Sequence, residues 1–180
     1  MSFLQTKFSV SNTLILLSIF FTLLAFIFNN MYIFWMNDRF FQAGIYYIWP
    51  IQMFVSQFLH GNIMHLLFNS IFVYYFGNIL ESIIGSQKML LFFILNTLFL
   101  GIVITFFGRA TTVWISGFAL AILSYYTLLL WQRNNPEYTG GVTAIVLNLL
   151  IGLSPWISFL GHFWWMVFWG LFWYISQKKK

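Results

Sequence analysis

The chain has 180 residues, of which 61% are hydrophobic, 23% are aromatic and only 6% are charged. Soluble domains carry about a quarter of their residues as Asp, Glu, Lys or Arg. This composition excludes a soluble enzyme and a disordered chain, and it predicts an integral membrane protein. The net charge of +5 does not indicate nucleic-acid binding, because the charges are few and three of them are the terminal Lys178, Lys179 and Lys180. The lack of cysteine excludes disulfides and thiolate chemistry.

Six apolar runs are long enough to cross a bilayer as helices, since shorter runs are tolerated inside a bundle. In chain order they cover residues 10–28, 58–80, 89–107, 113–131, 142–153 and 156–175. We therefore expect an all-α polytopic membrane protein with six transmembrane helices in a single domain over residues 1–180. Residues 1–9 precede the first helix, and residues 176–180 form a basic tail after the last.

The lysines and arginines predict the orientation, because they favour the cytoplasmic side of the membrane. With six spans, both termini share one side with the second-to-third and fourth-to-fifth connections. That side carries six basic residues and the other carries two, Arg39 and Arg109. We therefore expect both termini in the cytoplasm, and the compact form without a further domain suggests a bacterial cell membrane.

The connection between the first two spans, residues 29–55, is long and rich in aromatic side chains. Tryptophan and tyrosine favour the headgroup region, so this loop is expected to lie in or on the outer membrane interface. One interpretation is simple anchoring, and the other is that the loop shapes access to a site. The aromatic residues are Tyr32, Trp35, Phe40, Phe41, Tyr46, Tyr47 and Trp49.

All three histidines, His60, His65 and His162, fall within predicted spans, where a polar side chain costs a few kcal/mol. His65 and Asn69 are four residues apart and therefore share one helix face. At 1.5 Å per residue, His65, His162 and the Ser116 that opens the fourth span come to a similar depth. Each residue alone is typical of helix–helix hydrogen bonding. Their convergence at one depth favours a functional site.

The chemistry of such a site is limited by the available side chains. His60 and His65 are five residues apart and no HExxH pair exists, so we predict neither a metal site nor a cofactor. A Ser–His–acid triad would need a carboxylate against the imidazole, and none lies at this depth. If Ser116 is a nucleophile, it must work as a dyad with His162 as the general base. Backbone N–H groups near Ser116, with His65 and Asn69, could hold a developing oxyanion.

These residues resemble the rhomboid intramembrane serine proteases. The segment Phe58-Leu-His-Gly-Asn-Ile-Met-His-Leu-Leu-Phe-Asn69, followed by Gly77-Asn-Ile-Leu-Glu81, is similar to the second-helix signature of that family over its whole length. Gly85-Ser-Gln-Lys88 is similar to the turn into the third helix. Ser116-Gly117 matches the end of the GxSG motif, and Gly161-His162 matches the sixth-helix histidine.

The resemblance implies an endopeptidase that cleaves single-span membrane proteins within or beside their transmembrane segment. Ser116 would be the nucleophile, His162 its base, and His65 and Asn69 the side chains of the oxyanion hole. His60 would support the outer end of the second helix, and the fifth span would form the side gate for substrate. The implied partners are transmembrane substrates and the lipid bilayer, and the oligomeric state is left open.

Five positions differ from the rhomboid pattern. Trp114 replaces the first glycine of GxSG, Ile51-Gln52 stands where the first loop usually has Trp-Arg, and Trp165 and Trp169 stand where the sixth helix usually has glycines. These differences support an alternative, a catalytically inactive rhomboid-like protein that binds transmembrane clients without cleaving them. A channel or transporter is less favoured, because most spans lack charged residues and the chain has no inverted repeat.

Overall fold

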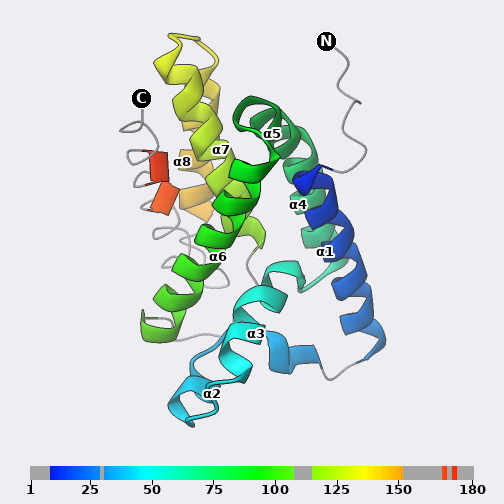
Figure 1. Cartoon of the computed structure of the whole chain (residues 1–180). Coiled ribbons are helices and arrows are strands. Elements are labelled where there is room, and N and C mark those ends of the chain that lie inside the picture. The colour runs from blue at the N-terminus through cyan, green and yellow to red at the C-terminus, as the bar shows by residue number, and fades with distance from the viewer. Residues whose placement is uncertain (1–8, 29–30, 108–114, 152–167, 170–171, 174–180) are drawn as a thin grey trace.

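The computed structural model describes residues 9–28, 31–107, 115–151, 168–169 and 172–173. These residues form a helical bundle (Figure 1), which confirms the all-α fold class. Three helical segments are long and apolar enough to cross a membrane, and a shorter apolar helix covers Gly117–Gln132. The elements in chain order are α1 (Val10–Ile27), η1 (Met31–Phe34), α2 (Arg39–Gln42), α3 (Ile48–Val55), η2 (Ser56–Phe58), α4 (Ile63–Phe72), the π-turn η3 (Val73–Gly77), α5 (Asn78–Ile84), α6 (Ser86–Phe107), α7 (Ile115–Gln132) and α8 (Tyr138–Ile151).

The first five predicted spans correspond to helices, but the second helix has a different start and a different end from those predicted. The second helix begins at Ile63 rather than at residue 58, because Ser56–Phe58 form a 3-10 turn and Asn62 caps the helix. It then continues through the π-turn to Ile84, beyond the predicted end at residue 80. The predicted sixth span lies largely outside the described residues, of which 168–169 and 172–173 are helical.

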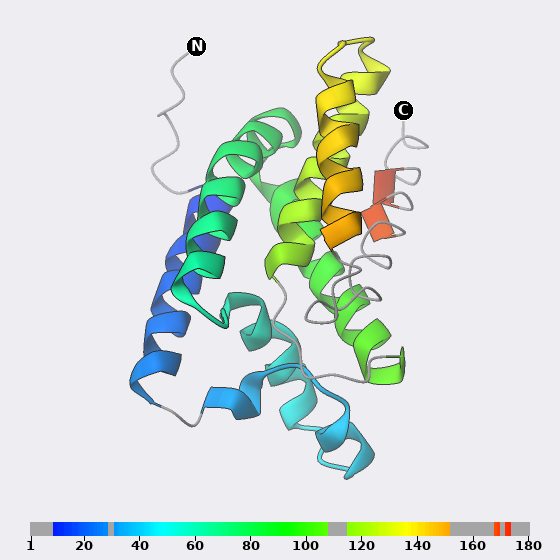
Figure 2. The same cartoon turned by 180° about the vertical axis from the view of Figure 1, so that it is seen from behind.

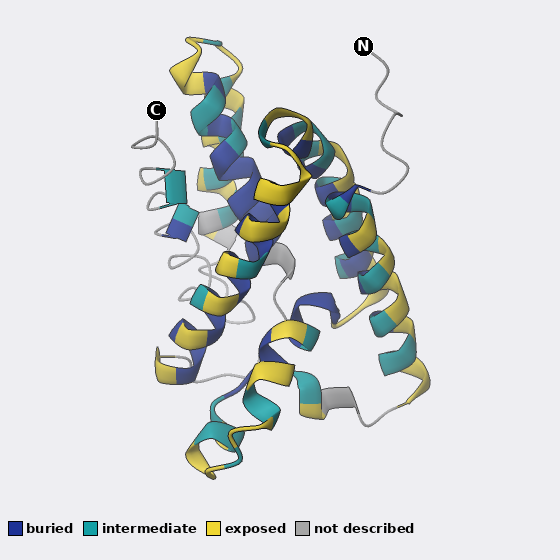
Figure 3. Cartoon of the chain, in the orientation of Figure 1, coloured by how far each residue is buried: buried dark blue, intermediate teal, exposed yellow. Residues whose placement is uncertain are grey.

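The bundle has two distinct ends. The start of α1, the turn between α5 and α6 and the turn between α7 and α8 lie at one end (Figure 1), and Figure 2 shows the same arrangement from behind. The short helices α2 and α3 lie at the opposite end. Helix α7 contacts α4, α5, α6 and α8, and its residues are mostly buried (Figure 3). It is therefore the central helix of the described bundle.

An aromatic cluster holds α6, α7 and the last described segment together. The ring of Phe92 in α6 lies 5.6 Å from that of Phe118 and 5.7 Å from that of Tyr125, both in α7. It also lies 5.9 Å from the ring of Phe168 and 4.8 Å from that of Phe172. Aromatic pairs in this range contribute about 0.5–1.5 kcal/mol each beyond their buried area. The last described segment is thus packed against α6 and α7.

The long connection at residues 29–55 is anchored to the bundle by side-chain contacts. The buried Gln52 donates through Nε2 to the carbonyls of Ile33 at 2.8 Å and Trp35 at 3.1 Å, which ties η1 to α3. The indole of Trp49 donates to the hydroxyl of Thr105 in α6 at 2.6 Å. Gln52, one of the differences from the rhomboid pattern, therefore has a clear structural role in this loop.

A single carboxylate joins the beginnings of two long helices. Glu81, which is 5% exposed, accepts hydrogen bonds from the backbone N–H groups of Val10 at 2.8 Å and Ser11 at 2.9 Å. It also accepts from the hydroxyls of Ser11 at 2.8 Å and Ser86 at 2.6 Å. Helix N-termini carry unpaired N–H groups and a partial positive charge, so a carboxylate is stabilising there. Gly77 permits this approach, since a Cβ at Gly77 would lie 2.9 Å from Ser11 Oγ.

We expect Glu81→Gln to destabilise the fold, because it removes the charge and turns an NH₂ group toward N–H and O–H donors. Hydrogen bonds to a charged group contribute about 1.5–3 kcal/mol each, so the loss should be on the order of 3 kcal/mol. Thermal unfolding in detergent micelles measures it. Glu137→Gln, at an exposed position after α7, is the matched control and should leave Tm unchanged. Equal Tm values for the two variants would contradict this role.

Helices α7 and α8 approach each other closely at one glycine. A Cβ on Gly141 would overlap the side chain of Thr127, whereas a Cβ on the neighbouring Gly140 would meet nothing within 4 Å. We therefore expect Gly141→Ala to lower the free energy of unfolding by about 1–3 kcal/mol, as overpacking commonly does. Gly140→Ala should be neutral or stabilising, because alanine favours a helix over glycine. Thermal unfolding of the two variants side by side tests this, and an unchanged Tm for Gly141→Ala would refute the close packing.

Candidate functional site

The second helix presents two of the predicted site residues on one face. Asn62 precedes α4, and its side-chain oxygen accepts the backbone N–H of His65 at 2.8 Å, which caps the helix. One turn further along, Asn69 is 8% exposed, whereas the side chain of His65 is partly exposed. The local structure therefore places an imidazole and a buried amide next to each other on α4.

The side-chain amide of Asn69 has a buried N–H donor that makes no hydrogen bond among the described residues. Its Nδ2 atom is inaccessible to solvent and has no hydrogen-bond partner among the described residues. Leaving such a donor unsatisfied costs about 1–3 kcal/mol. By contrast Asn78, two turns or more along the same segment, has its side chain bonded to Ser9, Asn12 and the Tyr74 carbonyl. Asn69 therefore differs from Asn78 on the same segment, although Asn96 in α6 likewise has buried side-chain atoms without a partner among the described residues.

His60 lies in the irregular segment before α4 and is 2% exposed. Its Nδ1 atom is 3.0 Å from the hydroxyl of Thr22 in α1, and its ring meets that of His65 edge to face with centroids 5.1 Å apart. Sequence reasoning anticipated that His60 supports the outer end of the helix. The contact with Thr22 was not anticipated, because nothing in the local pattern links the two residues.

Ser116 lies in the first turn of α7, which begins at Ile115, and Gly117 beside it is buried. Helix α4, which carries His65 and Asn69, packs against α7. The backbone of Ser116 is therefore at the start of a helix that contacts the helix of the other two site residues. Its side chain, together with His162, Trp114 and Trp165, lies outside what the structure describes.

Of the two tryptophans that replace sixth-helix glycines, Trp169 is the one that the structure describes. It is partly buried and packs against an apolar cluster that includes Leu100 of α6 and Leu120 of α7. The indole therefore packs against side chains of both α6 and α7.

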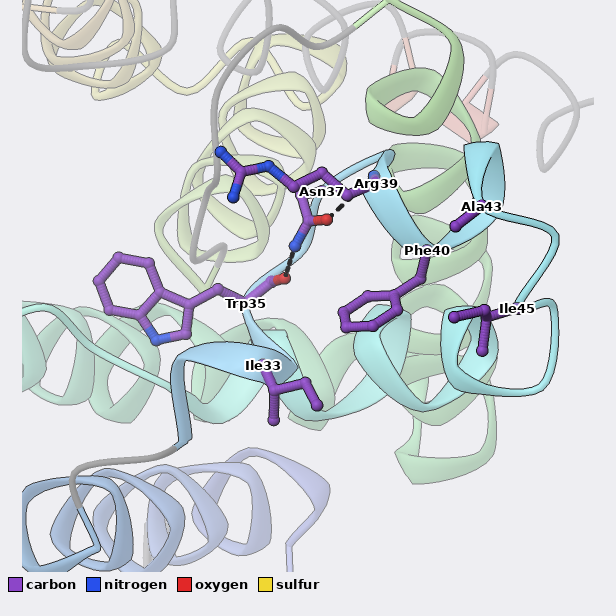
Figure 4. A pocket seen from close by; sticks show the side chains of 7 residues that line it. All are labelled: Ile33, Trp35, Asn37, Arg39, Phe40, Ala43 and Ile45. Carbon is purple, nitrogen blue, oxygen red and sulfur yellow. Dashed lines mark hydrogen bonds between the residues drawn. The ribbon is translucent and has the colours of Figure 1, made fainter.

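The described residues contain no group of three or more His, Cys, Asp or Glu side chains that would hold a metal ion. A cavity of about 700 Å³ lies in the loop at residues 33–45, away from the helix α4 residues (Figure 4). Asn37 shapes it by donating to the Trp35 carbonyl at 2.8 Å and accepting the Arg39 N–H at 3.0 Å. In Figure 4 the Arg39 guanidinium lies on the same side as the Trp35 indole. None of the predicted site residues lines this cavity.

Comparison with known proteins now identifies the family. The model of the rhomboid domain matches residues 48–177, well over half of the chain. Over 112 residues, or 60% of its length, the chain is 27% identical to rhomboid protease GlpG of Salmonella paratyphi A, and the same values hold for Salmonella newport and Salmonella typhi. The matched segment covers 39% of each of these relatives, so the chain spans about two-fifths of their length. With its apolar helices and this domain match, the chain is an integral membrane protein that belongs to the rhomboid family.

Proposed function

We propose that this protein is an intramembrane serine endopeptidase that cleaves single-span membrane proteins in or near their transmembrane segment. The single observation that carries the proposal is the buried Nδ2 donor of Asn69, which has no partner among the described residues and lies beside His65 on a helix packed against the helix that opens at Ser116. A donor held ready at a cost to stability is typical of a group that acts on a transient charge. The relationship to proteins named rhomboid protease supports the same reaction class.

In the proposed reaction, Ser116 Oγ attacks the carbonyl carbon of the scissile peptide while His162 accepts its proton. The carbonyl oxygen becomes an oxyanion and accepts hydrogen bonds from Asn69 Nδ2, from His65 and from the Ser116 N–H. Collapse of this intermediate breaks the C–N bond, and the leaving amine takes the proton from His162. A water molecule, deprotonated by His162, then hydrolyses the acyl-enzyme and restores the serine.

We also propose that the chain crosses a bacterial cell membrane six times with both termini in the cytoplasm. The described cations support this orientation. The start of α6, whose first turn contains Lys88, and the turn after α7, which contains Arg133, lie at the end of the bundle where α1 begins (Figure 1). Arg39, in α2, lies at the opposite end. If the N-terminus is cytoplasmic, the positive charges are expected at the end of the bundle where α1 begins.

Fluorophosphonate labelling of the purified protein tests the dyad without a known substrate. We expect the wild-type chain to be labelled, and Ser116→Ala and His162→Ala to lose the label while they keep their thermal unfolding transition. An active rhomboid protease is the positive control. If the control is labelled and this chain is not, the alternative function applies, in which the chain binds transmembrane clients without cleaving them. The sequence differences at Trp114, Trp165 and Trp169 favour that alternative.

The role of Asn69 can be separated from a structural one by a pair of leucine substitutions. Asn69→Leu removes an unpartnered buried donor at similar volume, so Tm should stay the same or rise. The labelling rate should fall by roughly 10²–10³, the typical cost of one oxyanion donor. Asn78→Leu should behave in the opposite way, with a clear loss of Tm, because that amide is fully bonded. A stability loss in Asn69→Leu without a loss of labelling would refute the assignment.

A further inference from the structure

Thr22 connects the first helix to the segment that leads into α4. Its side chain is 0% exposed, and its hydroxyl lies 3.0 Å from the Phe58 carbonyl and 3.0 Å from His60 Nδ1. These two partners flank Leu59, which is also 0% exposed. One hydroxyl of α1 therefore holds both ends of the short turn through which the chain enters the site helix.

If the Thr22 hydroxyl makes both of its contacts as hydrogen bonds, counting donors assigns the proton of His60 to one nitrogen. A hydroxyl has one hydrogen, and a carbonyl can only accept, so the Thr22 hydrogen is donated to the Phe58 oxygen. The hydroxyl oxygen must then accept from His60, which requires a proton on Nδ1. In the neutral ring, Nε2 consequently bears the lone pair. That atom is buried and has no hydrogen-bond partner within the described part of the chain.

The residues between this turn and α4 are fixed to the candidate site. Asn62 accepts the His65 N–H at 2.8 Å, and the His60 and His65 rings meet edge to face with centroids 5.1 Å apart. On the α1 side, the ring of Phe58 stacks on that of Phe21 at 5.7 Å. Residues 58–62 are thus clamped between α1 and the first turn of α4. A displacement of this turn would move His65 and, one helical turn later, Asn69.

We propose that Thr22 is a positioning residue for the candidate oxyanion hole, acting through the Phe58 carbonyl and the Nδ1–H tautomer of His60. It touches neither substrate nor the reacting atoms. The expected effect on catalysis rests on the proposed function. The tautomer and the geometry of the turn follow from the two hydrogen bonds of Thr22 alone. Because packing and hydrogen bonding contribute separately at this position, a residue of the same shape without the hydroxyl distinguishes them.

The test compares Thr22→Val, which keeps the shape, with Thr22→Ser, which keeps the hydroxyl. We expect Thr22→Val to lower the fluorophosphonate labelling rate about 10-fold, because a sub-ångström shift of positioned groups costs less than the roughly 10² of a 1 Å misplacement. With a cleavable transmembrane reporter, kcat should fall and KM should stay unchanged. Thr22→Ser should restore both rates. Thr13→Val is the control, since the Thr13 hydroxyl bonds to the Ser9 carbonyl near the start of its own helix.

A second readout does not depend on activity. In protein with ¹⁵N-labelled histidine, NMR should report the Nδ1–H tautomer for His60 in the wild type and in Thr22→Ser, and its loss in Thr22→Val. An Nε2–H tautomer in the wild type overturns the proposal, even if Thr22→Val does not fold. Wild-type labelling by Thr22→Val also overturns it and leaves the proposed function intact. Absence of labelling in the wild type, beside a labelled positive control, overturns the proposed function, while the NMR result still decides the Thr22–His60 bond.

Discussion

The Glu81 carboxylate is the interaction on which the described bundle depends most. Four hydrogen bonds to Glu81 of α5 bring together the start of α1 and the start of α6, so that three helices are joined at one anionic group. A carboxylate in an apolar bundle is costly unless each lone pair is used, and here the donors come from two helix N-termini that need an acceptor. The carboxylate therefore accepts the N–H groups at the start of α1, and its bond to the Ser86 hydroxyl fixes the position of α6 relative to α1.

The two ends of the second membrane segment differ in whether their buried polar side chains have hydrogen-bond partners. Towards Glu81 the polar side chains are satisfied, as the three partners of Asn78 illustrate. Towards α4 the buried donor of Asn69 and the buried Nε2 of His60 have no partner among the described residues. Satisfied polar groups rigidify a bundle, whereas unsatisfied ones need another explanation. The rigid end around Glu81 would hold the end with the unsatisfied polar groups in place.

The sequence predicted the helices well because long apolar runs have few alternatives in a membrane. It placed the start of the second helix too early, since an apolar run does not reveal that Asn62, rather than an earlier residue, caps α4. The structural role of Glu81 was missed, although a lone carboxylate at the end of an apolar span, five residues before Ser86, was a usable signal. The Thr22 contact could not be predicted, because it joins residues 38 positions apart through tertiary packing alone.

The π-turn Val73–Gly77 has a consequence for the register between the two ends of this segment. Asn69, Val73, Gly77 and Glu81 are all buried and follow one another at intervals of four residues. In an ideal α-helix, three such intervals would rotate the last position by about 120° away from the first. A π-turn takes in about one residue more than an α-turn, which removes most of that rotation. The number of residues between the anchor and the site is therefore fixed, so a single insertion or deletion there would disconnect the two without altering any side chain that forms them.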